Sequence, residues 1–405
     1  MASTSWQDAA DFMAPASSII ASFWVFAVLI AYPYVIYPPL IWILSRLLGR
    51  EPRAPDITAP SLSLLIVARN EEGVIQRRID NALALEYPPG RIEIVVASDG
   101  SSDQTARIVR QNAHRGVRLI ELAGSGGKAS ALNAVFGQLG GDIVLLSDAN
   151  TQFDPSAARQ LARWFADPAV GVVCGRLILL DPLTGRNADG LYWRFETTLK
   201  VCEARLAALL GANGAIYAVR RSVYPALPDR TIVDDFVVPL LARLRHGCAV
   251  LYDSTAIAHE ASAPSLREEF RRRCRIGAGD FQSLALLWPL LNPRRGFISF
   301  SFFSHKLLRW LCPFFLIGLL VSSAALAGRP FFRVAVSAQL AFYAVSAVVM
   351  VAPRQIRFPR IVTLAAMFVS MNAALLTGFW VWLTRSGQGR WEPTRREEHA
   401  GGQLG

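Results

Sequence analysis

Acidic residues follow short apolar segments at several points between residues 62 and 280, where the strands of an α/β sheet would end. The sequences are ARNEE (68–72), ASDGSSDQT (97–105), LLSDAN (145–150) and VDDF (233–236). In open α/β sheets, ligands bind at the carboxyl ends of the strands, so these carboxylates are expected to gather at one edge. A lysine joins them in GKASALNA (127–134). Acids and a lysine at such an edge suit a phosphorylated ligand and a divalent metal.

Asp148 ends one of these apolar segments, and Asn150 follows it two positions later. At a strand end, a carboxylate and a second oxygen-bearing side chain can hold a hard cation that bridges phosphate oxygens. Because Asp-x-Asn is also an ordinary turn sequence, the metal interpretation depends on the strand position and on the neighbouring motifs.

Asp99 occupies the same position on another predicted strand, and Gly100 allows a tight turn after it. A carboxylate at this point can accept hydrogen bonds from a base or a ribose. Ser101, Ser102 or Asp103 can cap the helix that follows, which explains part of the sequence but not Asp99 itself.

Lys128 follows a glycine-rich loop at the start of a predicted helix. A helix N-terminus and a lysine both favour phosphate. The spacing of a Walker A loop is absent, and a solvated loop lysine is the alternative.

Asp234 and Asp235 are adjacent acids in an otherwise apolar segment. A carboxylate near a basic group and a reacting hydroxyl can act as a general base. The alternative is a pair of acids that stabilises the N-terminus of the following helix.

Strands and helices alternate along this part of the chain, which is typical of a doubly wound α/β fold. Helices are predicted at 71–85 and from about residue 102. Strands are predicted at 62–68, 92–97, 117–122, 142–148, 170–180 (a strand or a hairpin) and near 249–252.

Long apolar segments flank the α/β region of this 405-residue chain, which is 52% hydrophobic. A membrane helix needs about 20 apolar residues, and this length is reached near 17–48, 307–327, 330–352 and 361–383. The first sixteen residues contain Asp8 and Asp11 but no Lys or Arg, so they do not resemble a cleavable signal peptide. Pro33, Pro38 and Pro39 predict that the first helix bends or ends near the interface.

Basic residues predict the orientation of these segments. Arg46, Arg50 and Arg53 follow the first one, which places the next domain in the cytoplasm. One span before that domain and three after it would put the C-terminus outside. The tail and the loop before the last span carry arginines that favour the cytoplasm: Arg385, Arg390, Arg395, Arg396, and Arg354, Arg357, Arg360. Either one segment is re-entrant or residues 296–304 contribute another pass.

The net charge of +11 lies largely beside the apolar segments. The clusters are Arg267, Arg271, Arg272, Arg273, Arg275, and then Arg294 and Arg295. Anionic lipid headgroups attract such residues, and no motif predicts nucleic acid binding. The five cysteines lack metal-ligand spacing and are interpreted as small apolar residues.

These observations divide the chain into five parts. We expect an N-terminal membrane helix (1–50), an α/β domain (51–279), an interfacial amphipathic helix (280–296), C-terminal transmembrane helices (297–385) and a polar tail (386–405). A core helix of the α/β domain is the alternative for the third part.

The set of motifs resembles the family 2 glycosyltransferases with the GT-A fold, a Rossmann-like α/β domain. It is most similar to the membrane-embedded polysaccharide synthases, which include cellulose, chitin and hyaluronan synthases. The resemblance covers residues 61–284.

The resemblance implies a role for each motif. Nucleotide-sugar contacts would come from Ala68, Asn70, Glu71, Asp99, Lys128 and Asp148, with Asp99 near the uracil and Lys128 at the diphosphate. Asp148 and Asn150 would hold the metal. Gly211, Asn213 and Gly214 belong to an acceptor-side loop (211–221), and the second acid of the pair Asp234–Asp235 would be the base.

Two positions depart from the family pattern. The metal motif is usually Asp-x-Asp, whereas here the second acid is Asn150, a weaker ligand. The Gln-x-x-Arg-Trp motif of processive synthases appears as Arg272-x-x-Arg275-Ile276. Arg275 can still neutralise the departing diphosphate, and Arg272 lies on the acceptor side. The missing tryptophan puts processive polymerisation in doubt.

The resemblance therefore implies an inverting hexosyl- or N-acetylhexosaminyltransferase at the cytoplasmic face of the inner (plasma) membrane. It would use a UDP-sugar, Mg²⁺ or Mn²⁺ and a glycan or lipid-linked acceptor, in exopolysaccharide or cell-envelope glycan synthesis. One alternative is a single-addition transferase acting on a polyprenyl-phosphate-linked acceptor. Another is a non-catalytic membrane subunit of a polysaccharide export complex, with export proteins as partners.

Overall fold

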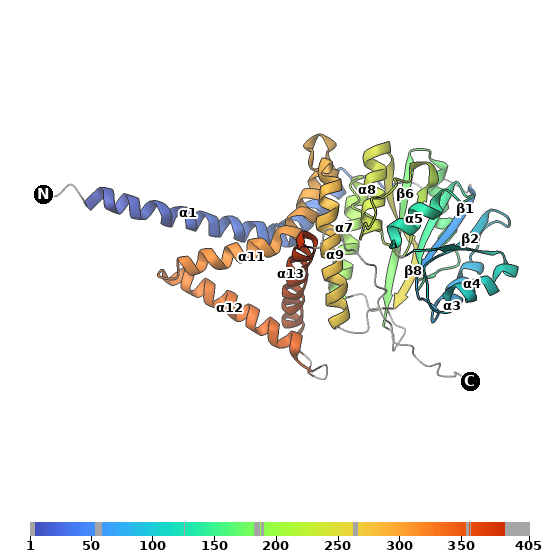
Figure 1. Cartoon of the computed structure of the whole chain (residues 1–405). Coiled ribbons are helices and arrows are strands. Elements are labelled where there is room, and N and C mark those ends of the chain that lie inside the picture. Colours follow the sequence, from blue (N-terminus) through green and yellow to red (C-terminus); the bar gives the residue numbers. More distant parts are fainter. Residues whose placement is uncertain are drawn as a thin grey trace. The chain divides into compact units, whose positions relative to one another are not determined.

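The computed structural model describes residues 5–52, 59–124, 126–181, 187, 190–261, 266–353, 356 and 358–384. The chain forms two compact units (Figure 1). The membrane unit comprises Met1–Leu40, Arg273–Phe281 and Phe302–Leu383, and the sheet unit comprises Ile41–Arg272, Gln282–Ser301 and Thr384–Gly405.

The sheet unit is built on an eight-stranded mixed sheet with the order β3-β2-β1-β4-β7-β6-β8-β5. Its strands are β1 (Leu62–Ala68), β2 (Ile92–Asp99), β3 (Val117–Leu122), β4 (Ile143–Asp148), β5 (Gln152–Phe153), β6 (Val170–Leu180), β7 (Tyr217–Arg220) and β8 (Ala249–Ala261). Its principal helices are α3 (Ile75–Leu83), α4 (Thr105–Gln111), α5 (Lys128–Phe136), α6 (Ala157–Ala162), α7 (Leu191–Arg205) and α8 (Asp234–His246).

The half of the sheet from β3 to β4 is parallel, and its connections are helices (Figure 1). The chain runs outward from β1 to β2 and β3 and then returns to β4 on the other side of β1. Because parallel crossovers are right-handed, α3 and α4 share one face of the sheet and α5 covers the other. The direction of winding reverses between β1 and β4, where doubly wound sheets bind ligands.

Both faces of the central strands are buried, as parallel sheets require. Every residue of β1 is buried. Leu64, Ile66 and Val96 on the strands pack with Ile75 and Ile79 of α3 in one apolar cluster. This packing explains why the strands are continuous runs of β-branched and aliphatic residues instead of alternating patterns.

Several predicted elements are confirmed and others are displaced. The strands 62–68 and 117–122 match β1 and β3 residue for residue. Residues 170–180 form one strand, and the strand near 249–252 extends to Ala261. A doubly wound α/β sheet is therefore present, with β7 antiparallel to β4 and β6.

The first two helices of the sheet unit start later than predicted. Asn70 has a left-handed backbone (φ 54°), so the chain turns before α3 begins at Ile75 rather than at residue 71. The Glu71 and Glu72 N–H groups donate to Thr105 Oγ1 at 2.8 Å and Asp103 Oδ2 at 3.1 Å. Asp103 Oδ1 also accepts from the Thr105 N–H, so α4 begins at Thr105 rather than at Ser102.

Four helical segments among the described residues are long and apolar enough to span a membrane: Ser17–Leu47, Phe297–Ala325, Pro330–Val351 and Arg360–Thr384. The first joins α1 (Ser5–Ala31) to α2 (Tyr37–Leu47) through a π-helical turn, Tyr32–Ile36. That turn contains Pro33, which accounts for the predicted irregularity.

The second membrane segment overturns one predicted alternative. It comprises α10 (Phe297–Ser301), a π-helical turn (Phe302–Leu307) and α11 (Leu308–Ala325). Residues 296–304 therefore begin this segment and do not form an additional pass. The arginines of the tail, together with Arg354 and Arg357, lie outside the described residues.

Within the membrane unit, α1 lies along α11, which also contacts α12 (Pro330–Val351) (Figure 1). The Tyr32 hydroxyl lies 3.1 Å from Ser304 Oγ, so the two π-helical turns are joined by a hydrogen bond. Apolar side chains of the membrane unit are exposed: Val351 of α12 is 83% exposed, and Ile361 of the Arg360–Thr384 helix is 81% exposed. Such exposed apolar surfaces suit a lipid environment.

The predicted interfacial helix is not a separate element. Residues 280–287 continue α9 (Leu266–Leu287), and two short 3-10 turns, Trp288–Leu291 and Pro293–Arg295, follow. Pro289 and Pro293 each lie at the start of a 3-10 turn, which interrupts the α-helix. The five-part division of the chain otherwise stays a prediction.

Candidate active site

The predicted chemical residues meet at the carboxyl edge of the parallel strands in the sheet unit. Asp99 ends β2, Asp148 ends β4, and Ala68 ends β1. Lys128 is the first residue of α5, and Asp234 is the first residue of α8. The register aligns Val67 with Asp148 and Ala68 with Ser98, which places these strand ends side by side.

Lys128 lies between two of the acids. Its Nζ is 2.8 Å from Asp148 Oδ1 and 3.4 Å from Asp234 Oδ2. The Asp234 side chain is 7% exposed and that of Asp148 is 37% exposed, so a ligand from solvent reaches Asp148 more readily. The alternative of a solvated loop lysine is wrong, because the Lys128 side chain is only 16% exposed.

Burial and charge act in opposite directions in this cluster. Burial alone would lower the pKa of Lys128, but Asp148 and Asp234 outweigh it and raise that pKa. Burial, together with the neighbouring Asp235 and Asp148 carboxylates, raises the pKa of Asp234 to about 6, although Lys128 partly offsets them. The cluster therefore holds a firmly charged lysine and a carboxyl group that titrates near neutral pH.

Asp235 lies against the loop predicted to face the acceptor. The Gly214 N–H donates to Asp235 Oδ2 at 3.0 Å, and the Ala212 N–H donates to the Asp235 carbonyl at 2.9 Å. A Cβ at Gly214 would lie 3.1 Å from Asp235 Oδ2, and one at Gly211 (φ +85°) would lie 2.9 Å from Phe236. Glycine thus permits close approach of this loop to the first turn of α8.

Asn213 anchors the same loop to the neighbouring strand. Its Nδ2 donates to the Gly175 carbonyl at 2.7 Å, and its backbone N–H donates to Cys174 Sγ at 3.2 Å. Lys200 of α7 donates to Asn213 Oδ1. Lys200 was not predicted as a site residue, because nothing in the local sequence links α7 to residue 213.

The predicted nucleotide end is formed by two interlocked loops. Asn70 Oδ1 accepts from the Ser102 N–H at 2.8 Å, and the Asn70 N–H donates to Ser101 Oγ at 3.2 Å. Asp99 is 1% exposed, and burial raises its pKa, which Arg69 and the Gly127 backbone N–H partly oppose. Its Oδ2 has no hydrogen-bond partner in the described part of the chain. A buried carboxylate oxygen in this state can accept a hydrogen bond from a base.

Two of the predicted site residues gather no such support. Arg272 forms an ion pair with Glu269 on its own helix, at 3.6 Å, and its side chain is 47% exposed. Arg275 belongs to the membrane unit. Their roles beside the acceptor and the diphosphate stay predictions.

The oxygen atoms that Asp148 and Asn150 offer can be compared with the ligands that a divalent metal requires. Asp148 supplies one half-exposed carboxylate, and Asn150 can supply one amide oxygen. Across the described residues, no group of three His, Cys, Asp or Glu side chains gathers as a protein-only metal cage. Mg²⁺-type sites instead use one or two carboxylates plus substrate phosphates and water. The residues present fit a metal that binds together with a diphosphate.

Tyr217 was also missed by sequence reasoning. It lies on β7 opposite Leu146 of β4 and is fully buried. Its hydroxyl has no hydrogen-bond partner among the described residues. Burial raises its pKa well above the usual value, and Asp234 adds to that effect, so the phenol is neutral beside the acids.

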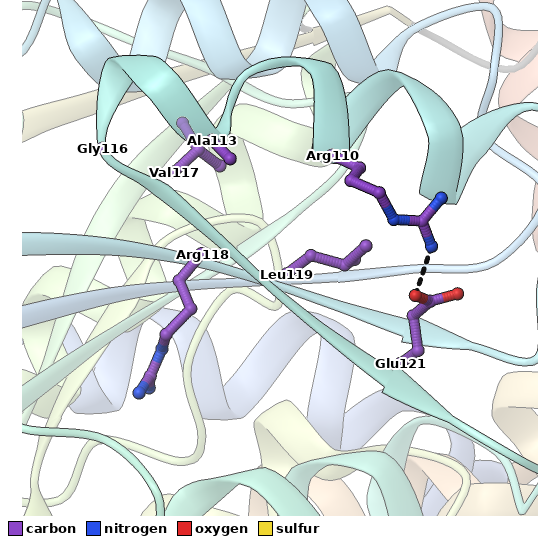
Figure 2. A pocket seen from close by; sticks show the side chains of 7 residues that line it. All are labelled: Arg110, Ala113, Gly116, Val117, Arg118, Leu119 and Glu121. Carbon is purple, nitrogen blue, oxygen red and sulfur yellow. Dashed lines mark hydrogen bonds and ion pairs between the residues drawn. The ribbon is translucent and has the colours of Figure 1, made fainter.

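A hollow elsewhere on the sheet unit contains none of these residues. Figure 2 shows it beside the edge strand β3, with Arg110 of α4 paired with Glu121 of β3. Its other lining residues include Arg118 and Leu119. Charged side chains on an edge strand discourage pairing with another chain, which is a sufficient account of this hollow.

Comparison with known proteins identifies the fold of the sheet unit. The chain has the fold of a mannosyltransferase from Pyrobaculum calidifontis solved with GDP-Man and Mn²⁺. The TM-score is 0.70 at 20% identity, over 91% of this chain and 99% of the other. The sheet unit therefore has the GT-A-like fold.

Residues 63–214 match the profile described as glycosyl transferase family 2, so the chain carries a family 2 glycosyltransferase domain. It is 36% identical to a beta-monoglucosyldiacylglycerol synthase of Trichormus variabilis over 251 residues, 58% of this chain and 52% of the relative. It is 30% identical to a poly-beta-1,6-N-acetyl-D-glucosamine synthase of Staphylococcus aureus over 203 residues, 46% of this chain and 47% of the relative. The chain thus spans about half the length of these curated relatives.

Proposed function

We propose that this protein is an inverting glycosyltransferase. It transfers a sugar from a UDP-sugar to an acceptor hydroxyl at the cytoplasmic face of the inner membrane. The observation that carries the proposal is Lys128, held between Asp148 and Asp234 with the Asp235 carboxylate on the next residue. This arrangement offers a cation for a leaving diphosphate and a carboxylate for the attacking hydroxyl.

In the proposed step, the acceptor oxygen attacks the anomeric carbon from the face opposite the diphosphate. The new carbon–oxygen bond forms as the bond to the diphosphate breaks, and its electron pair leaves with UDP. An oxygen of Asp235 takes the proton of the acceptor hydroxyl. The Gly214 N–H, 3.0 Å from Asp235 Oδ2, orients that carboxylate.

Charge on the departing UDP is stabilised by residues of two helices and a strand. The Lys128 ammonium would leave Asp148 and pair with the diphosphate. Mg²⁺ or Mn²⁺ bound at Asp148 and Asn150 would supply Lewis-acid stabilisation of the same oxygens. Asp234 keeps Lys128 in place through the 3.4 Å ion pair.

The nucleotide is proposed to bind across the strand ends of β1 and β2. Asp99 faces the uracil with a carboxylate oxygen that has no hydrogen-bond partner among the described residues. Asn70 and Glu71 follow β1 and hold the loop after β2, where Asn70 forms hydrogen bonds with Ser101 and Ser102. The solved mannosyltransferase of the same fold carries GDP-Man, which supports a nucleoside-diphosphate sugar as the class of donor.

The membrane location is supported by the four apolar helices and by their charges. The sheet unit lies in sequence between the first and second of them, next to Arg46 and Arg50. If all four segments span, the loop between the third and fourth is on the same side as the sheet unit. That loop contains Arg354 and Arg357, and the positive-inside rule then puts both in the cytoplasm.

Asp235→Asn tests the proposal directly. The variant should lose transfer by about a hundredfold or more, the scale of general-base catalysis, and should bind UDP nearly as well as the wild type. Release of UDP from a panel of UDP-sugars and calorimetric titration with UDP measure the two properties. Full turnover by the variant would show that Asp235 is not the base, and lack of UDP release by the wild type would favour a non-catalytic membrane subunit.

A second candidate is single addition of a sugar to a lipid acceptor. Ile276 stands where processive synthases of the family carry tryptophan, and one relative is named as a glucosyldiacylglycerol synthase. The other relative is named as a polysaccharide synthase, which favours repeated addition. Chromatographic sizing of the product formed in lipid vesicles distinguishes them: one added sugar supports the lipid candidate, and a ladder supports polymerisation.

A further inference from the structure

Arg78 is a buried cation that the proposed reaction does not use. Its side chain is the largest by volume of the fully buried side chains among the described residues, and it is 0% exposed. The other inward residues of α3, Ile75, Ile79 and Ala82, are apolar. Burying a guanidinium is costly, and the Arg78 Nη2 has no hydrogen-bond partner among the described residues. The contacts of its Nε and Nη1 therefore indicate what the residue does.

The first contact of Arg78 is with Ser147, the residue that precedes the metal motif. Its Nε donates to Ser147 Oγ at 3.2 Å, and Ser147 directly precedes Asp148. The Ser147 hydroxyl in turn donates to the Asp148 carbonyl at 3.0 Å. Arg78 is also attracted electrostatically to the Asp148 side chain.

The other contacts of Arg78 reach Phe153, the residue that follows the loop 148–152, directly and through Asn81. Its Nη1 donates to Asn81 Oδ1 at 2.8 Å. Asn81 binds both backbone groups of Phe153, accepting from the N–H at 2.8 Å and donating to the carbonyl at 2.9 Å. The guanidinium also lies over the Phe153 ring, 4.4 Å from its centroid.

These contacts fasten both ends of the loop 148–152 to helix α3. Only a planar group with several donors can reach Ser147, Asn81 and the Phe153 ring at once, and lysine lacks this shape. The arrangement matters more here than in an Asp-x-Asp site, because Asn150 contributes a neutral oxygen. Correct placement of the single carboxylate of Asp148 then determines how well a cation is held.

We propose that Arg78 is a positioning residue, which fixes the loop 148–152 so that Asp148 faces the metal and the donor diphosphate. The inference rests on the proposed function, since it takes Asp148 as a metal ligand. It assigns to α3 a share in metal binding that the sequence motif does not include.

The test measures Mn²⁺ binding to the purified full-length protein by electron paramagnetic resonance, with UDP present and no sugar transfer. Arg78→Met should weaken Mn²⁺ binding about tenfold to a hundredfold, the usual effect of residues that orient metal ligands. Ser147→Ala should weaken it less, and Arg78→Lys should lie between Arg78→Met and the wild type. Ile79→Val, a buried change on the same helix, should bind Mn²⁺ normally.

UDP affinity in the presence of a chelator should be unchanged in all four variants, because Asp99 is left intact. Wild-type Mn²⁺ affinity in both Arg78→Met and Ser147→Ala would overturn the inference and leave Arg78 a structural residue. If Arg78→Met does not fold, Ser147→Ala decides the matter by itself. Failure of the wild-type protein to bind Mn²⁺ with UDP would instead contradict the metal assignment in the proposed function.

Discussion

The ion pair between Lys128 Nζ and Asp148 Oδ1, at 2.8 Å, joins the N-terminus of α5 to the carboxyl end of β4. Each partner neutralises the other while no ligand is bound. Binding of a metal at the carboxylate and of a diphosphate at the ammonium would separate them. The pair therefore couples the two halves of the proposed donor site, because a ligand that engages one partner releases the other.

Lys128→Met should damage both stability and catalysis. It leaves Asp148 and Asp234 without their shared cation, and breaking a buried ion pair costs about 3–5 kcal/mol. Loss of a group that stabilises the leaving diphosphate should reduce kcat/KM about 10²–10³-fold. Thermal melting and UDP release measure the two effects. Arg118→Met, on the exposed edge strand β3, is the control, and equal activity in the two variants would contradict the role of Lys128.

Asp234 should make stability depend on pH. Its pKa is raised from 3.8 to about 6, chiefly by burial, so the folded state favours the protonated carboxyl. Its contribution to stability is complete below about pH 4 and is lost as the pH rises through about 6. The loss is about 3 kcal/mol, since one pKa unit corresponds to about 1.4 kcal/mol.

Asp234→Asn, which cannot ionise, removes this dependence. The melting temperature of the variant minus that of the wild type should therefore increase between pH 4 and pH 7. A difference that stays constant over this range would show that Asp234 does not titrate there.

Much of the fold could be predicted because its strands are uninterrupted apolar runs. β1 and β3 begin and end where the sequence predicts, and Asp99 and Asp148 end the neighbouring strands β2 and β4. Parallel strands must align their carboxyl ends, so a residue that ends a strand has a predictable position in space. Asp148, which ends β4, and Lys128, which follows β3, are near one another for this reason, whereas Asp234 begins α8 after the antiparallel strand β7.

The residues that support the site could not be predicted, because their contacts cross long stretches of sequence. Arg78 and Ser147 are 69 positions apart, and Lys200 reaches Asn213 from a different helix. An arginine in an amphipathic helix is ordinarily solvated, and only the packing of α3 on the sheet shows that Arg78 is buried. The late start of α3 depends similarly on side chains of the next loop.

Gly214→Ala should reduce turnover without changing the affinity for UDP. The added Cβ would lie 3.1 Å from Asp235 Oδ2, so the proposed base must shift by a few tenths of an ångström. Small misplacements of reacting groups slow catalysis, and we expect kcat to fall roughly tenfold while UDP affinity is retained. Gly137→Ala is the matched control, since a Cβ there meets nothing within 4 Å. Equal kcat for both variants would show that the loop tolerates the shift.

Asn150→Asp should restore a stronger metal site at a cost to the metal-free protein. The Asn150 Nδ2 is buried without a hydrogen-bond partner among the described residues. A carboxylate in its place lies two residues from Asp148, where two like charges repel until a cation binds between them. The variant should therefore melt at a lower temperature than the wild type in chelator and gain more from added Mn²⁺.

The same substitution separates a metal ligand from a turn residue at position 150. If Asn150 ligates the cation, Asn150→Asp should lower the Mn²⁺ concentration for half-maximal UDP release about tenfold, which is about 1.4 kcal/mol. Asn150→Ala should raise that concentration, because it removes the amide oxygen. If instead residue 150 only completes a turn, both variants will show the wild-type Mn²⁺ dependence and differ only in melting temperature.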